Sequence, residues 1–203
     1  MGKIKDSYLT LSDGAVSEIK IQKSKFIAQA FPVNSQLKFQ EILDNVRKAY
    51  YDAAHHPFAY RLGITEDNFR YSDDGEPTGS AGKPVLDAID KFELTDVCVI
   101  VTRYFGGVKL GVGGLRRAFF EATEECLKTA KIEERLITEE FEIESDYNQM
   151  NVIMKILEQN DANILSNNSD EKVRLKCSSR LSVLEAVKKE LVNATSGNIV
   201  IKG

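Results

Sequence analysis

One segment of the chain combines residue types that could bind an anion. Five of the chain's thirteen glycines fall within nine residues, with four cations and no acid around them. An apolar β-branched run precedes this segment and a helical pattern follows it, which predicts a strand, a glycine turn and a helix start that can cradle an anion. A tight turn packed on neighbouring backbone explains the glycines equally well. The residues concerned are Gly106, Gly107, Gly111, Gly113, Gly114, Arg103, Lys109, Arg116 and Arg117.

Two further groups contain residues capable of acid–base chemistry. The two histidines, His55 and His56, are adjacent, and three carboxylates lie within four residues at Asp73, Asp74 and Glu76. A histidine can act as an acid or base, and the carboxylates could do the same or bind a divalent cation. The candidate catalytic residues are His56, Asp73, Asp74 and Glu76, with His55 as the alternative histidine. Acids in a solvated loop, or paired with the basic segment and holding the two loops together, are the structural alternative.

The spacing of these residues matches none of the common metal or phosphate motifs. Adjacent histidines point in different directions and the cysteines are not paired in spacing, so we expect no metal. Gly82-Lys83 is followed by Pro84 where a P-loop needs serine or threonine, and Arg116 stands where the dinucleotide fingerprint needs glycine. No Gly-x-Ser-x-Gly elbow occurs. We therefore expect no cofactor.

Composition indicates an ordinary globular protein. The chain has 203 residues, is 42% hydrophobic and 29% charged, and carries a net charge of −4, which argues against nucleic-acid binding over its whole surface. No apolar run approaches the roughly 18 residues of a membrane span, and the N-terminal residues have no signal-peptide pattern. Three scattered cysteines fit a reducing compartment. We expect a cytoplasmic protein with no membrane partner; its oligomeric state is not evident from the sequence.

The hydrophobic periodicity predicts two α+β domains. The first contains strands at 15–22, 25–33, 58–64 and 97–101, and helices at 35–50, 84–89 and 114–128, with an exposed loop over 65–83. The second contains strands at 137–145, 163–166, 172–177 and 198–202, and helices at 148–159 and 181–193. The β-α-β-β-α-β order of the second domain is ferredoxin-like. We place the boundary near Arg135, giving domains 1–134 and 135–203.

Three segments of the first domain resemble, in order and spacing, the signature of the IMPACT/YigZ family. They are HHPFAYRLG at 55–63, YSDDGEPTGSAGKPVL at 71–86 and VTRYFGGVKLGVGGLRRAF at 101–119. The chain departs from the family pattern at Pro57, where members usually have cysteine, and at Arg116, where they have valine. Pro57 excludes a cysteine nucleophile at that position. Arg61, in the first segment, joins the expected nucleic-acid contacts.

The resemblance implies a fold and a biological context. It implies a two-layer α/β N-terminal domain of the type shared by a ribosomal small-subunit protein and elongation factor G, followed by the ferredoxin-like domain of bacterial members. It also implies regulation linked to translation, because eukaryotic relatives compete in the pathway that activates an initiation-factor kinase. Some bacterial members are labelled dipeptidases, but this sequence shows no obvious set of ligands for two metals.

Three functions remain open from the sequence. The first is a non-catalytic, translation-linked regulator that binds RNA or the ribosome through the glycine-rich basic surface. The second is a regulator that binds a translation-regulating protein through the same domain. The third is a hydrolase or phosphate-ligand enzyme that uses His55 or His56 with the acids at 73, 74 and 76. We expect the first, because a likeness of fold suggests it and the cations are clustered, although fold alone does not establish function.

Overall fold

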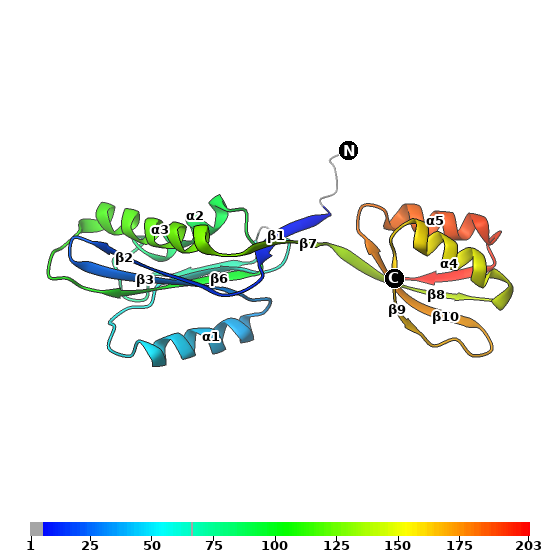
Figure 1. Ribbon diagram of the computed structural model, residues 1–203, viewed down its shortest axis with the longest axis horizontal. Coiled ribbons are helices and arrows are strands. Elements are labelled where there is room, and N and C mark those ends of the chain that lie inside the picture. Colours follow the sequence, from blue (N-terminus) through cyan, green and yellow to red (C-terminus); the bar gives the residue numbers. More distant parts are fainter. Residues whose placement is uncertain (1–5, 66) are drawn as a thin grey trace. The chain divides into compact units, whose positions relative to one another are not determined.

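The computed structural model describes residues 6–65 and 67–203, which form two compact units (Figure 1). The N-terminal unit contains Tyr8–Arg135, and the C-terminal unit contains Leu136–Gly203 together with Asp6 and Ser7. Asp6 belongs to the second unit because its carboxylate accepts a hydrogen bond from the Ser182 backbone N–H at 2.7 Å. Whether the parts 1–134 and 135–203 fold independently stays a prediction.

The N-terminal unit is built mainly on a five-stranded sheet in the order β2-β3-β6-β4-β5. Its neighbouring strands are all antiparallel. A separate two-stranded sheet pairs β1 with β7. The strands are β1 (Ser7–Leu11), β2 (Ala15–Ile21), β3 (Ser24–Pro32), β4 (Phe58–Arg61), β5 (Phe69–Ser72), β6 (Val97–Tyr104) and β7 (Ile132–Leu136), and the helices are α1 (Gln36–Ala49), α2 (Gly82–Lys91) and α3 (Gly111–Thr129).

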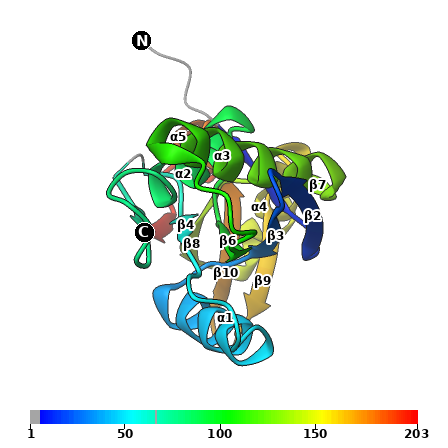
Figure 2. The same cartoon turned by 90° about the vertical axis from the view of Figure 1, so that its left-hand side faces the viewer.

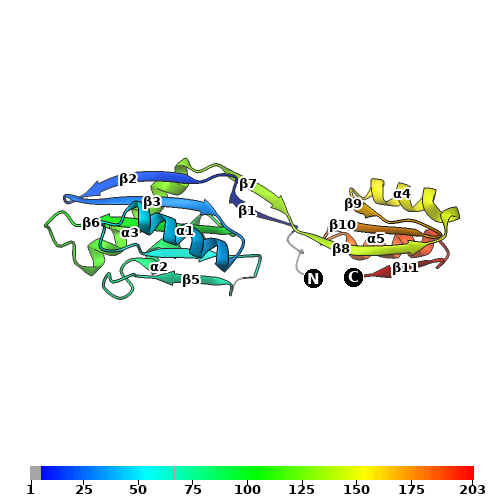
Figure 3. The same cartoon turned by 90° about the horizontal axis from the view of Figure 1, so that it is seen from below.

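Helices cover both faces of the five-stranded sheet, so this unit has three layers rather than the two expected. Helices α2 and α3 lie on one face and α1 on the other (Figures 1 and 2), and Figure 3 shows α1 in front of the sheet. The central strand β6 is buried at every position from Val97 to Thr102. A continuous apolar run of this kind is typical of a strand covered on both faces.

The two faces of the sheet form separate cores. Val99 and Val101 pack with Phe119 of α3, whose ring meets that of Phe26 edge-on with centroids 5.2 Å apart. On the opposite face, Ile100 packs with Phe39 of α1 in a second cluster. Alternate residues of β6 therefore serve different cores, as the period of a strand requires.

The C-terminal unit has the ferredoxin-like arrangement, and the prediction of a mixed α+β chain is confirmed. Its sheet has the order β11-β8-β10-β9 and is antiparallel throughout, and α4 and α5 cover one face of it (Figure 1). The elements are β8 (Thr138–Ser145), a short 3₁₀ turn at Tyr147–Gln149, α4 (Met150–Gln159), β9 (Asn163–Asn167), β10 (Val173–Arg180), α5 (Leu184–Ala194) and β11 (Ile199–Lys202).

Three short strands were not expected from the sequence, namely β1, β5 and β7. Strand β5 lies within the segment 65–83 that we interpreted as a loop. Its four residues, Phe69–Ser72, are at the sheet edge, where Phe69 and Tyr71 are 41% and 42% exposed. A short edge strand with both faces partly solvated has no apolar alternation that a sequence pattern could detect.

The β2–β3 hairpin turns at Gln22 and Lys23, whose φ angles of 43° and 67° are those of a type I′ turn. The backbone at Gly106, just after β6, passes directly against this turn. A Cβ at Gly106 would collide with the main chain of Lys23, and the Gly106 N–H donates to Ser24 Oγ at 3.2 Å. Gly106 is therefore required by close backbone packing.

This contact predicts opposite outcomes for two glycines of one segment. Gly106→Ala should lower the free energy of unfolding by about 1–3 kcal/mol, because the new methyl meets backbone that cannot rotate away. Gly113→Ala is the matched control, since its Cβ would meet nothing within 4 Å and alanine favours a helix by up to about 1 kcal/mol over glycine. Urea denaturation of both variants measures the difference. Equal losses would contradict this interpretation of Gly106.

Candidate functional site

The three signature segments meet at one end of the N-terminal sheet. The pairing of β4 with β6 continues beyond β4, since His55 and Arg103 form an isolated antiparallel bridge and the Val101 N–H donates to the Pro57 carbonyl at 2.8 Å. The histidines therefore lie beside the end of β6, where the glycine-rich segment begins. We call residues 105–114 the glycine loop.

A buried ion pair joins the glycine-rich segment to residues 73–81, the loop between β5 and α2 that we call the acid loop. Arg103 Nη1 lies 2.7 and 2.8 Å from the two carboxylate oxygens of Glu76, with side chains only 11% and 3% exposed. The guanidinium also lies 5.7 Å from the centroid of the Phe26 ring and 5.5 Å from that of Phe105. Glu76 is therefore the acid that pairs with the basic segment and holds the two loops together. Arg103 is thus engaged inside the protein, and we do not count it among residues that face a partner.

The other two acids of the loop also have partners within the protein. Asp73 accepts hydrogen bonds from the N–H groups of Gly79, Ala81 and Gly82 at 2.7, 2.9 and 2.9 Å, and so holds the start of α2. Asp74 accepts one from Arg47 Nη2 at 2.7 Å. These contacts are typical of carboxylates that fix a loop and a helix start.

The two histidines differ in burial and in hydrogen bonding. His56 is 5% exposed, and its backbone N–H donates to Asp74 Oδ2 at 2.7 Å. Its ring atom Nε2 is buried without a hydrogen-bond partner among the described residues. Burial lowers the pKa of His56, and the Asp74 carboxylate opposes that shift. His55 Nδ1 lies 2.6 Å from the Asp74 carbonyl, which requires that Nδ1 carry the proton because a carbonyl only accepts. A Cβ at Gly75 (φ +92°) would clash with the His55 ring.

His55 lines a cavity of about 490 Å³ at this end of the sheet. Tyr104 donates to Asp52 Oδ1 at 2.7 Å at its rim, and this bond raises the pKa of Tyr104 to about 12. The lining contains no serine, threonine or cysteine that could act as a nucleophile. The residues that line it are Asp52, Ala53, Ala54, His55, Glu76, Arg103, Tyr104 and Phe105.

The glycine loop presents apolar side chains to solvent. Phe105, Val108 and Val112 are 59%, 41% and 53% exposed. Gly107 and Gly111 have φ angles of +85° and +67° and open space around them, so they allow the chain to turn without a packing role. Gly113 and Gly114 lie within the first turn of α3, which begins at Gly111. No side chain caps this helix, so its first N–H groups point to solvent or to a partner.

Of the other cations expected to bind an anion, Lys109, Arg116 and Arg117 lie in or just after the glycine loop, whereas Arg61 lies on β4. Lys109 and Arg117 are exposed and make no ion pair in the part of the chain that the structure describes. Arg116 is also exposed and donates to the Gly79 carbonyl at 3.0 Å. Arg61 pairs with Asp90 and lies opposite Val97, at the other end of β6 from Arg103. Six strand residues span about 20 Å, so Arg61 lies outside this site.

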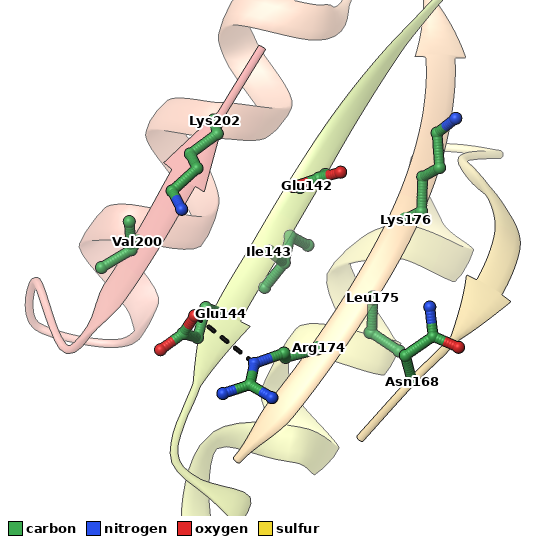
Figure 4. Close-up of a pocket in the computed structure, with 9 residues that line it drawn as sticks. All are labelled: Glu142, Ile143, Glu144, Asn168, Arg174, Leu175, Lys176, Val200 and Lys202. Carbon is green, nitrogen blue, oxygen red and sulfur yellow. Dashed lines mark ion pairs between the residues drawn. The ribbon is translucent and has the colours of Figure 1, made fainter. Parts of the chain in front are cut away.

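The outer face of the C-terminal sheet has different chemistry (Figure 4). A hollow of about 140 Å³ there has no aromatic residue in its lining. Lys176 and Lys202 stand on the strands either side of Glu142, and Arg174 Nε lies 3.6 Å from Glu144 Oε2. Acids and cations therefore alternate across this face, which offers neither a cationic groove nor a ring for base stacking.

Within residues 6–65 and 67–203, no group of three or more histidine, cysteine, aspartate or glutamate side chains is placed to hold a metal ion. In the same described residues, no helix is both long enough and apolar enough to cross a membrane.

The ion pair predicts a large cost for removing one charge. Glu76→Gln should lower the free energy of unfolding by about 3–5 kcal/mol, because it leaves the Arg103 charge buried without its counter-charge. Glu125→Gln is the control, since its pair with Lys128 is exposed and pairs of that kind contribute at most about 1 kcal/mol. Urea denaturation at neutral pH tests this. Similar losses in both variants would mean that the Arg103 site accepts water.

Burial of His56 predicts a pH-dependent stability. The pKa of His56 is lower in the folded chain than its usual 6.5, so the unfolded chain binds more protons and stability should fall as pH drops below about 6.5. His56→Gln removes this contribution. We expect the loss of unfolding free energy between about pH 7.5 and about pH 5.5 to be smaller in the variant. The same loss in both proteins would contradict the burial of a neutral imidazole.

Comparisons with known proteins agree with the signature segments. A family model described as the Impact N-terminal domain matches residues 22–127, and one described as a domain of unknown function, DUF1949, matches residues 130–198. The IMPACT family member YvyE of Bacillus subtilis is 38% identical over 141 residues, which is 70% of this chain and 65% of that protein. An IMPACT family member of Haemophilus influenzae is 31% identical over 197 residues, 96% of each chain.

A solved structure supports the same conclusion. A crystal structure of a hypothetical protein matches with a TM-score of 0.71 and 26% identity, over 98% of this chain and 97% of that one. The fold of both units is therefore shared with a known protein. Together, the two domain matches and the full-length relative show that this chain belongs to the IMPACT/YigZ family.

Proposed function

We propose that this chain is a non-catalytic, translation-linked regulator that binds RNA, free or in the ribosome, through the glycine loop and the start of α3. The observation that carries the proposal is the composition of this exposed surface. It presents an aromatic ring, Phe105, together with the cations Lys109 and Arg117, which make no ion pair with any residue that the structure describes. Aromatic stacking and phosphate contacts are two of the means by which proteins hold single-stranded RNA.

The loop geometry supports a phosphate contact at the start of α3. The first N–H groups of a helix without a side-chain cap carry partial positive charge and lack partners. Gly111 and Gly113 bear no side chain there that would block an approaching phosphate. Lys109 lies just before these groups and Arg117 about one turn after Gly114, so a full charge lies on either side of them. Arg116 already donates to a carbonyl and contributes its remaining N–H groups.

The same residues give less support to a hydrolase. Asp73, Asp74 and Glu76 accept hydrogen bonds from backbone or arginine groups, and His56 is buried. His55 lines the cavity, but the lining contains no serine, threonine or cysteine that could act as a nucleophile. We therefore assign no reaction to this site.

A protein partner is the second candidate, because three exposed apolar side chains favour it. Phe105, Val108 and Val112 lie close together in the chain and are each more than 40% exposed. Exposed aromatic and aliphatic groups on one loop are typical of protein contact sites. Binding of this kind should depend weakly on salt, whereas RNA binding should depend on it strongly.

A salt titration with single-stranded RNA tests the proposal. Three phosphate contacts predict a slope of about −2 for the logarithm of affinity against the logarithm of salt concentration. Lys109→Ala should reduce that slope by about 0.7, and Phe105→Ala should weaken binding by about 1–3 kcal/mol with the slope unchanged. Lys155→Ala and Tyr147→Ala are controls on the C-terminal unit, where both residues are exposed.

The two candidates give different results in this experiment. Unchanged affinity and slope in both loop variants would contradict RNA binding at this surface. Capture of a protein from a bacterial lysate that survives ribonuclease and high salt, and is lost in Phe105→Ala but not in Tyr147→Ala, would instead support the protein partner.

A further inference from the structure

Strand β9 lies at one edge of the C-terminal sheet without a charged residue or a proline to protect it. It has a hydrogen-bonded neighbour, β10, on one side alone. The free side of an edge strand presents N–H and C=O groups to which another strand can pair, and proteins normally prevent this with charged residues or proline. The sequence of β9, Asn163–Asn167, contains neither.

The other edges of the two larger sheets are protected by charge. Strand β2 carries Glu18 and Lys20, β5 carries Arg70, and β11 carries Lys202. Among the edges of the two larger sheets, as far as the structure describes them, β9 is thus the one that lacks a charged residue. Because 29% of the chain is charged, this difference distinguishes β9 from its counterparts.

The uncharged stretch extends beyond the strand and exposes aliphatic side chains. Residues 162–169 contain no charge, and Ile164 and Leu165 are 38% and 49% exposed. The pairing of β9 with β10 is irregular between Lys176 and Cys177, which leaves Leu165 bulged. Bulges often protect an edge, but here the bulged residue is an exposed leucine rather than a charged one.

The charges that bound this stretch are neutralised locally. Asp161 pairs with Arg180 at 2.8 Å, and Asp170 pairs with Arg174 at 2.9 Å. Two copies of the stretch could therefore run antiparallel without bringing unpaired like charges together. An antiparallel alignment about Leu165 would set Asn163 of one copy opposite Asn167 of the other, and amide side chains satisfy each other's hydrogen bonds.

We propose that β9 pairs with β9 of a second copy of this chain, antiparallel about a two-fold axis. The pairing would join two four-stranded antiparallel sheets into one of eight strands, and a two-fold interface of this kind uses the same surface on both copies. One short edge buries much less than the roughly 800 Å² per partner of a stable interface. The dimer is therefore weak and forms as concentration rises.

Sedimentation of the full chain over a concentration range of about 10 µM to about 1 mM tests this proposal. The wild-type protein should pass from monomer to dimer within that range. Leu165→Lys places a charge on the edge and should weaken association at least about tenfold, the equivalent of 1.4 kcal/mol. Val200→Lys on the opposite edge strand, where the side chain is 53% exposed, is the matched control and should behave as wild type.

Hydrogen exchange of the wild-type protein gives a second readout that needs no variant. Amides of β9 should become more protected at high concentration, and those of β11 should not. A wild-type chain that stays monomeric throughout, or equal association by both lysine variants, would overturn the proposal. A monomeric chain that captures another protein through β9, with capture lost in Leu165→Lys, would also overturn it, because the edge would then receive a foreign strand.

Discussion

The buried pair of Arg103 and Glu76 is the interaction on which the arrangement of the signature segments depends. It connects the end of β6 to the loop after β5, two segments that lie 27 residues apart in the sequence. Two charges with so little exposure are stable only together, because either alone would keep the full cost of leaving water. The pair therefore fixes the point at which the chain leaves the sheet and the glycine loop begins.

The acid loop is held on its other side by contacts that reinforce this pair. Asp73 organises the start of α2, and Asp74 joins α1 to the backbone of His56. Each acid thus connects the loop to a different element. Since residues that share a network are coupled in their effects on stability, the acid cluster is better described as a structural junction than as a set of independent acids and bases.

Most elements could be predicted from the sequence because they carry a clear period, and the exceptions have physical reasons. Strand β5 is short and half-solvated, so no alternation marks it. Two layers were expected, and the helix layer formed by α1 was not, although the unbroken apolar run from Val97 indicates a strand buried on both faces. In the site, burial of Arg103 depends on the distant Glu76, and the remoteness of Arg61 depends on the antiparallel pairing of β4 with β6. Neither follows from local spacing.

The two surfaces for which we propose partners are chemically different and belong to different compact units. The glycine loop combines cations with an exposed ring, whereas the β9 edge is uncharged and offers backbone groups. Lys109 and Leu165 belong to units that have separate cores. Substitutions in separate structural contexts are usually additive. A variant that no longer self-associates should therefore bind RNA with unchanged affinity per chain. If its RNA affinity falls instead, the two copies of the dimer bind one RNA together.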